Sequence, residues 1–243
     1  MDLVLIGGAA FGTSILSALA GLGGGILLLV VIAQFLAPTT AIPIQGAMQL
    51  ASNGSRAMLL GRDVAWRPVL WSSLLLFPAS VLGASVATSM PEDATRLAMG
   101  TFVLVVAWRP QLLGWPGAER LPERALIGVG AVAGFLNSTV GASGPVTSPF
   151  FKAVTAGHTA FVATAAASQV IAHTSKIAAF SLDGFNPLDH AAVIGVGVAG
   201  VVSGSFVGTR LLGRFSEQRL NLLFKVVLTA LAIRLIGQAA LSV

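Results

Sequence analysis

Two copies of one pattern lie 120 positions apart in this chain. The first copy contains Gly21-Leu-Gly-Gly-Gly25, followed by the polar residues Gln49, Asn53, Ser55 and Arg56. The second contains Gly141-Ala-Ser-Gly-Pro145, followed at the same distances by Gln169, His173, Ser175 and Lys176. A helix-breaking stretch and the polar face that follows it are therefore both duplicated. This arrangement is typical of membrane transporters that hold one substrate site between two repeats.

The chain is too poor in charge to be soluble. Only 9% of its 243 residues are charged, 55% are hydrophobic, and the mean hydropathy is +0.88. A soluble domain carries roughly 25% charged residues. We therefore expect an all-α integral membrane protein with the lipid bilayer as its solvent. The N-terminal Met1-Asp2-Leu3 lacks the basic region of a secretory signal, so the first apolar stretch is expected to remain as a membrane segment.

Other classes of protein are excluded by what the sequence lacks. It has no cysteine, which rules out disulfides, thiol catalysis and cysteine metal sites. The net charge of +5 comes from basic residues scattered through short loops, so nucleic-acid binding is not expected. No metal-ligand spacing, P-loop or nucleophile–base pair is present, so we expect no cofactor and no catalytic residue.

Two apolar stretches are too long for one membrane crossing. The apolar stretches run approximately over 3–36, 40–60, 67–88, 94–113, 123–155, 157–181, 189–212 and 218–241. A crossing needs about 20 residues, and both 3–36 and 123–155 are longer and contain a Gly-rich sequence. Each of these two is expected either to make two short crossings or to enter the bilayer and turn back. The chain then forms one transporter domain over 1–243, with repeats 3–113 and 123–241 joined by a linker at 109–124.

Charge placement favours this topology. The basic clusters are Arg62 with Arg67, Arg109 with Arg120 and Arg124, and Arg210 with Arg214 and Arg219, whereas Glu92, Asp93, Asp183 and Asp189 lie in the connections between them. All three basic clusters lie in the cytoplasm only if 123–155 doubles back. The linker is then cytoplasmic, both termini are outside, the second repeat is inverted, and the chain has about ten helical segments.

The polar residues of each copy share one helical face. Gln49, Asn53 and Arg56 are spaced i, i+4 and i+7, and so are Gln169, His173 and Lys176. Because a polar face toward lipid is costly, both faces are expected to point toward each other or toward an aqueous cavity. Two basic side chains and several amide donors then converge on a site that suits an anion.

The Gly-rich breaks provide a second set of candidate contacts. A helix that restarts at Gly24 or Gly144 aims its positive N-terminal end at the middle of the bilayer, where an oxyanion can bind. We expect substrate contacts from Gly23, Gly24 and Gly25 at the first break and from Ser143, Gly144 and Thr147 at the second. Asn137, Ser138 and Thr139, just before the second break, are further candidates.

Each feature also has a structural interpretation. Arg56 and Lys176 lie near segment ends, where long basic side chains can extend to the membrane interface. The deeper polar residues can instead join neighbouring helices by hydrogen bonds. The Gly-rich stretches can serve close packing, as can the small residues of Gly83-Ala-Ser-Val-Ala-Thr88 and Gly204-Ser-Phe-Val-Gly-Thr209.

Ion coupling has one candidate residue. No carboxylate lies in the middle of an apolar segment, so sodium coupling through Asp or Glu is not expected. His173 is the only deep side chain of a type that titrates near neutral pH, which makes it the candidate for proton coupling.

The duplicated breaks, the two-repeat hydropathy and the Gln-containing helices resemble the sulfite exporter TauE/SafE family of membrane permeases (TSUP family). The resemblance runs from Leu3 to Ile236. It implies secondary transport, by export across the bacterial inner membrane, of small sulfur-containing anions such as sulfite or organosulfonates like sulfoacetate. In the second copy Ser143 and Pro145 replace two glycines of the first, so the local geometry there is less regular.

The leading hypothesis is an exporter that works by alternating access, with two repeats rocking around a midplane site. One alternative is a channel-like conduit for an anion or a small neutral solute. Another is a membrane scaffold or sensor that transports nothing, and an intramembrane enzyme has the least support. The expected partners are a small anionic substrate and the bilayer, and a homodimer formed through a small-residue helix face is compatible with the sequence.

Overall fold

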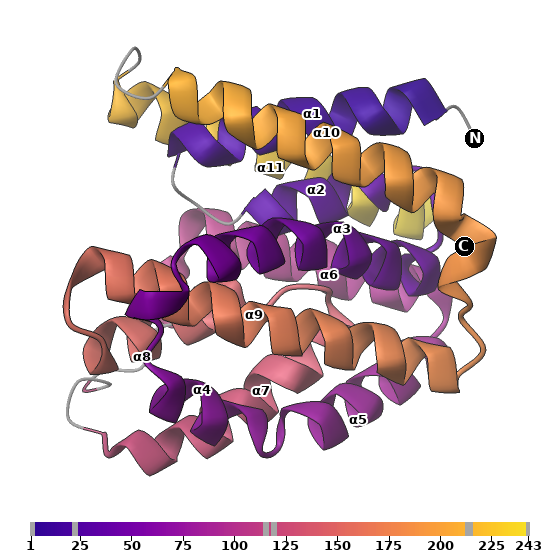
Figure 1. Cartoon of the computed structure of the whole chain (residues 1–243). Coiled ribbons are helices and arrows are strands. Elements are labelled where there is room, and N and C mark those ends of the chain that lie inside the picture. The colour runs from indigo at the N-terminus through magenta and orange to yellow at the C-terminus, as the bar shows by residue number, and fades with distance from the viewer. Residues whose placement is uncertain (1–2, 21–23, 114–116, 118–120, 212–215, 242–243) are drawn as a thin grey trace.

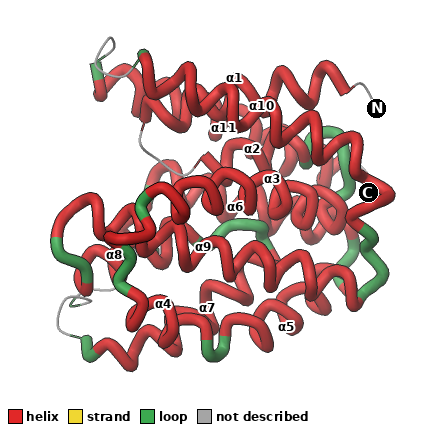
Figure 2. Tube along the Cα trace, viewed as in Figure 1, coloured by secondary structure: helices red, strands yellow, loops and turns green. Residues whose placement is uncertain are grey.

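The computed structural model describes all residues except 1–2, 21–23, 114–116, 118–120, 212–215 and 242–243. The described residues form helices joined by short loops and contain no strand (Figure 2). The helices of the first half are α1 (Leu3–Ala20), α2 (Gly24–Ile32), α3 (Pro38–Leu59), α4 (Trp66–Ser73), α5 (Leu76–Ser89) and α6 (Glu92–Trp108). Those of the second half are α7 (Leu126–Thr139), α8 (Gly144–Val154), α9 (Gly157–Leu182), α10 (Ala191–Arg210) and α11 (Glu217–Leu241). Short 3₁₀ turns are η1 (Gly61–Asp63), η2 (Pro110–Leu112), η4 (Glu123–Ala125) and η5 (Pro187–His190).

The second Gly-rich sequence breaks a helix, as its residues predict. α7 ends at Thr139 and α8 begins at Gly144. Gly141 between them has a φ of 78°, a left-handed conformation that favours glycine. Pro145 lies in the first turn of α8, where its missing N–H costs no helical hydrogen bond. In the first copy α1 ends at Ala20 and α2 begins at Gly24, while Gly21, Leu22 and Gly23 lie outside the described residues.

One bend was not expected from the sequence. The apolar stretch 67–88 forms two helices, α4 and α5, which meet at an angle of 45°. Pro78 has no N–H to donate to the carbonyl of Leu74, four residues earlier, so the helix cannot run through this point unbroken.

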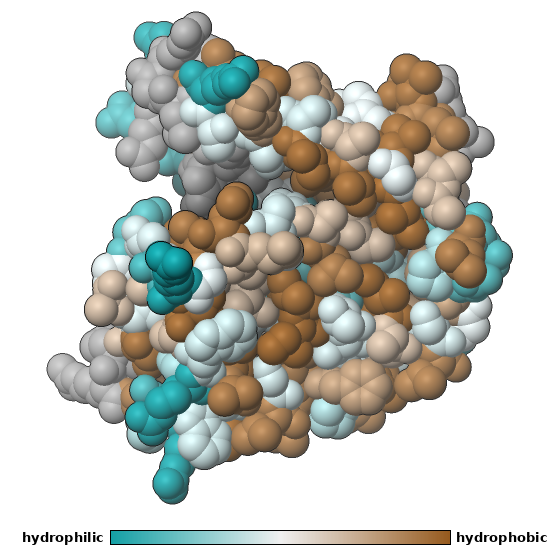
Figure 3. Space-filling view, viewed as in Figure 1, coloured by the Kyte–Doolittle hydropathy of each residue, from teal (hydrophilic) through white to brown (hydrophobic). Residues whose placement is uncertain are grey.

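Apolar surface separates two polar ends of the molecule. Figure 3 shows hydrophilic residues gathered at both ends, with mostly apolar residues between them. Among the described residues, Pro187–Arg210 and Gln218–Leu241 are each long and apolar enough to cross a membrane, and α4 with α5 qualifies as one bent span. α3, with 22 residues, and α9, with 26, are similar in length to these spans, but they carry the polar residues of the duplicated pattern. The all-helical fold with apolar helices is that of a membrane protein.

Helices of the first half pack against helices of the second half. α1 contacts α10, α5 contacts α7, α3 contacts α9 and α6 contacts α11. α3 and α9 lie side by side and run in opposite directions across the centre of the molecule (Figure 1). The N-terminal end of α1 and the C-terminal end of α11 lie at the same end of the bundle (Figure 1). The centre of the molecule is therefore shared by both halves of the chain.

Small residues allow two of these contacts, as the sequence predicts. A Cβ atom on Gly83 of α5 would collide with the carbonyl oxygen of Phe135 on α7. A Cβ atom on Gly204 of α10 would collide in the same way with the carbonyl oxygen of Phe11 on α1. Because backbone atoms cannot move aside, only glycine permits the helices to approach this closely.

Candidate functional site

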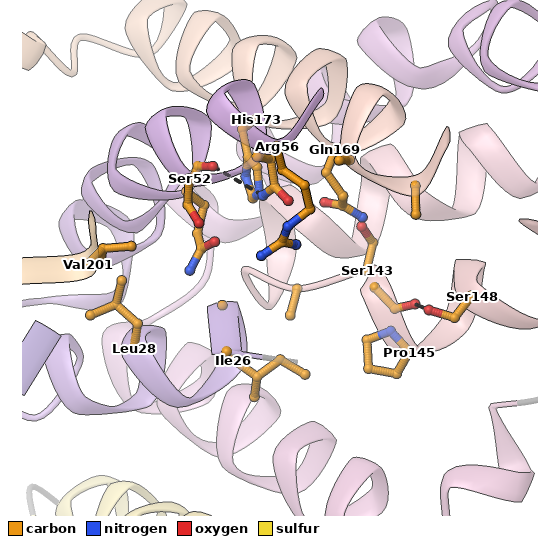
Figure 4. Close-up of a pocket in the computed structure, with 18 of the residues that line it drawn as sticks. Ile26, Leu28, Ser52, Arg56, Ser143, Pro145, Ser148, Gln169, His173 and Val201 are labelled. Carbon is orange, nitrogen blue, oxygen red and sulfur yellow. Dashed lines mark hydrogen bonds between the residues drawn. The ribbon is translucent and has the colours of Figure 1, made fainter. Parts of the chain in front are cut away.

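A cavity of about 450 Å³ lies within the bundle, and both helix breaks contribute to its lining. Its wall is formed by parts of α1, α2, α3, α7, α8, α9 and α10. Figure 4 shows Arg56 extending from α3 into this cavity, with Gln169 and Ser143 on the facing side. The volume lies in the range of small-molecule sites.

Ten of the twelve predicted contact residues line this cavity. They are Gly24, Gly25, Gln49, Asn53, Arg56, Ser143, Gly144, Thr147, Gln169 and His173. Gly23 lies outside the described residues, and Lys176 does not line the cavity. The two polar helix faces and the two helix breaks thus meet at one place, as their duplication predicts.

The α3 face changes from exposed to buried along its length. Arg56, near the end of α3, is exposed, whereas Asn53 and Gln49 are buried. Gln45, one turn before Gln49, is only 1% exposed. Asn53 donates from Nδ2 to the carbonyl oxygen of Gln49, which fixes the direction of its amide. The lining is therefore exposed near Arg56 and buried near Gln45.

The α9 face contributes Gln169 and His173. Gln169 is half-buried, and His173 is 4% exposed with an Nδ1 atom that has no hydrogen-bond partner among the described residues. His158 and Phe161, near the start of α9, also line the cavity. The α9 wall therefore contributes the ring of Phe161, two imidazoles and the amide of Gln169 to the cavity lining.

Lys176 is buried behind the cavity wall. Its side chain has no exposed surface, and its Nζ donates to Gln45 Oε1 at 2.8 Å. Two longer bonds, each of 3.4 Å, go to Asn137 Oδ1 and to the carbonyl oxygen of Gly141. The lysine does not extend to the membrane interface. It joins α9 to α3, to α7 and to the second helix break.

Several buried polar atoms near the second break lack a protein partner. Within the described part of the chain, Asn137 Nδ2, Ser143 Oγ and His173 Nδ1 make no hydrogen bond, and all three residues line the cavity. Asn137 and Ser143 are each 1% exposed. Buried polar groups are normally hydrogen-bonded, so these unpaired atoms in residues of the cavity lining are candidates for contact with a ligand.

Two important residues had weak signals in the sequence. Gln45 lies four positions before Gln49 on the same face of α3, but its repeat partner is Ala165, so the duplication does not mark it. Asn137 lies at the end of α7 and was expected only as a secondary contact. Thr13, Ser14, Ser52 and Ser148 are lining residues that the repeats do not mark, whereas Ser205 and Thr209 belong to the small-residue sequence from Gly204 to Thr209, which was expected to serve packing.

The cavity has a basic and neutral polar character. Arg56 and His158 line it, and no Asp or Glu is among the described lining residues. The ends of α3 and α10 and the start of α9 surround its exposed part, near Arg62 and Arg210. Such a lining favours an anion over a cation.

These features define a class of protein: a multi-pass helical membrane protein with broken helices around a polar cavity. The family model of the sulfite exporter TauE/SafE family matches residues 5–235, and the chain belongs to this family. No curated protein and no solved structure matches the chain. The family is one of membrane transporters, which indicates transport of sulfur-containing anions rather than catalysis.

Proposed function

We propose that the protein is a secondary transporter that exports small sulfur-containing anions, such as sulfite and organosulfonates of the sulfoacetate type, across the bacterial inner membrane. The observation that carries this proposal is the convergence of both polar helix faces and both helix breaks on one cavity. The substrate binds there through the ten lining residues predicted from the repeats. Helix N-termini and amide groups supply hydrogen-bond donors to an oxyanion.

The distribution of charge supports an anionic substrate. Arg56 is exposed to the cavity, and the described lining residues include no acid. A carboxylate in the wall would repel an oxyanion and attract a metal ion or an amine. The arginine is suited to bind a sulfite or sulfonate group through two parallel hydrogen bonds.

The two repeats, 3–113 and 123–241, are inverted with respect to each other in this proposal. A shift of 120 positions relates α1 to α7, α2 to α8 and α3 to α9. The helix contacts support this relation. If each helix is replaced by its counterpart in the other repeat, the α1–α10 contact becomes the α7–α5 contact. The α3–α9 and α6–α11 contacts stay the same, because the two helices of each pair are counterparts of each other. Inverted repeats of this kind allow two states that open to opposite sides.

The position of the cavity supports alternating access. Its exposed lining lies near Arg56, at the end of the molecule that carries Arg62 and Arg210, and its lining is buried near Gln45. We assign the basic end to the cytoplasm, which places both termini outside. The conformation is then inward-open, ready to take up an anion for export.

Reconstitution tests this proposal directly. The full chain in proteoliposomes is expected to transport sulfite and sulfoacetate with saturable kinetics and to accelerate exchange when unlabelled anion is present on the far side. The double variant Arg56→Ala with Lys176→Ala is expected to lose this flux. Absence of saturable flux with any oxyanion would refute the proposal.

The same experiment separates the alternatives. A channel-like conduit gives flux that neither saturates nor shows counterflow. A scaffold or sensor gives no flux, and the double variant then leaves solute binding unchanged. Thermal stabilisation of purified protein by sulfite, thiosulfate, sulfoacetate, taurine and carboxylate controls ranks the ligands, because a ligand that binds the folded state stabilises it.

A further inference from the structure

Lys176 is a buried lysine that has no acidic partner among the described residues. Its Nζ donates to three oxygen atoms, from Gln45, Asn137 and Gly141, which match the three N–H groups of an ammonium ion. All three oxygens are neutral, and no described residue gives Lys176 a carboxylate. A buried charge without a counter-ion is costly, so a negative charge close to Lys176 would stabilise its charged form.

The cavity lies on the other side of the groups that hold Lys176. Gln45, Asn137 and Gly141 all line the cavity, although Lys176 itself does not. Gln45 and Asn137 are each only 1% exposed. One layer of polar groups therefore separates the ammonium ion from the space in which a ligand can bind.

Asn137 connects Lys176 with the cavity. Lysine offers only donors, so Asn137 must turn its Oδ1 toward Lys176 and its NH₂ group the other way. This Nδ2 atom is buried and has no partner among the described residues, and neither has Ser143 Oγ at the N-terminal cap of α8. A hydrogen bond from a cation to the carbonyl of an amide polarises its N–H groups and makes them stronger donors.

We propose that Lys176 is the fixed counter-charge of the transported anion and that it acts through Asn137. The oxyanion accepts hydrogen bonds from Asn137 Nδ2 and Ser143 Oγ, and Lys176 supplies the positive charge from the opposite side of the same amide. Lys176 is thus a positioning residue, while Asn137 and Ser143 touch the substrate. This inference rests on the proposed function, and it identifies the region near the second break as the anion subsite.

Two substitutions test the inference, one at Lys176 and one at Asn137. Lys176→Met removes the charge but keeps the length of the side chain. Asn137→Asp gives Lys176 a built-in counter-ion and removes the NH₂ donor. The purified full chain is titrated with sulfite and with sulfoacetate, and its melting temperature is measured with and without ligand. We expect both variants to bind these anions at least about tenfold more weakly.

Stability without ligand provides the second readout. Asn137→Asp is expected to melt at the wild-type temperature or above it, because it pairs the buried lysine. A residue with a merely structural role would not combine weaker binding with unchanged or higher stability. This variant also keeps the test decisive if Lys176→Met fails to fold.

Matched controls exclude general charge effects. Lys225→Met removes a lysine that lies over Trp108, away from the cavity, and is expected to bind as the wild type does. Asn53→Asp adds a carboxylate to the same cavity without contact to Lys176. It is expected to weaken binding less than Asn137→Asp does and to give no gain in stability.

The outcomes for the inference and for the proposed function are distinct. Wild-type affinity in Asn137→Asp would overturn the inference, and saturable sulfite flux in the wild type would still support the function. If the wild type binds only another anion, such as acetate, but depends equally on Asn137 and Lys176, the proposed substrate is wrong and the inference is supported. Failure of the wild type to bind any anion would overturn both.

Discussion

Gly46 of α3 lies against the side chain of Lys176 of α9. A Cβ atom on Gly46 would be 2.7 Å from the Lys176 Cε, which is too close for two carbon atoms that are not bonded to each other. The next atom of the lysine is Nζ, which three hydrogen bonds hold in place. The absence of a side chain at position 46 therefore allows a full lysine chain to lie between two central helices.

We expect Gly46→Ala to destabilise the protein, because the added methyl group must displace a lysine that its hydrogen bonds hold. Overpacking of a tight interior typically costs about 1–3 kcal/mol. The measurement is unfolding of the purified protein by heat or denaturant. Gly54→Ala is the matched control, since it lies on the same helix with no heavy atom within 4 Å of the added Cβ.

The control variant Gly54→Ala is expected to be more stable than the wild type. Replacing glycine by alanine within a helix normally stabilises it by about 0.5–1 kcal/mol when there is space for the methyl group. Equal effects of Gly46→Ala and Gly54→Ala would mean that the Gly46–Lys176 contact does not restrict this position.

Arg56 is expected to govern the capture of anions. It lies at the exposed part of the cavity, so Arg56→Ala should raise the KM of sulfite flux by about tenfold, and flux in the variant should depend less on salt concentration. Arg62→Ala removes the same charge from the neighbouring turn, outside the cavity lining, and should have a small effect. If the two variants behave alike, Arg56 contributes only to the general field of the basic end.

His173 is the proposed proton acceptor. It is 4% exposed in the cavity wall, and its Nδ1 has no partner among the described residues. If it couples anion transport to protons, His173→Gln should abolish the acceleration of flux by an imposed pH gradient and preserve exchange at equal pH. His158→Gln, which changes an exposed histidine of the same cavity, is the control. Retained gradient dependence in His173→Gln would remove this residue from the coupling step.

The sequence predicts the helix break at 141–145 and the meeting of the polar faces, because glycine, proline and helical periodicity act locally. It does not predict the place of Lys176. Helical spacing puts Lys176 on the same face as Gln169 and His173, but the crossing of α3 at Gly46 covers it. Such a crossing depends on contacts between distant parts of the chain.

The importance of Gln45 was hidden for a related reason. The repeat marks positions that are polar in both copies, whereas Gln45 corresponds to Ala165. Gln45 makes two contacts that Ala165 cannot make: its Oε1 accepts from Lys176 Nζ, and its Nε2 donates to the carbonyl oxygen of Gly25. An internal repeat reveals what the two halves share, and Gln45 falls outside that pattern because position 165 holds alanine.

The absence of cysteine from the chain makes the direction of access measurable. Ser52 lines the cavity, and Asp63 lies exposed in the turn after α3 at the same end of the molecule. In Ser52→Cys and Asp63→Cys, a membrane-impermeant thiol reagent should modify both introduced thiols from the cytoplasmic side. Sulfoacetate should slow modification in Ser52→Cys only, because it occupies the cavity.

In Leu188→Cys the thiol lies in η5, at the opposite end, and should react from the outer side. Reaction in Ser52→Cys from the outer side alone would reverse the assigned orientation, and equal protection in Asp63→Cys would show that sulfoacetate acts on the reagent rather than on the cavity.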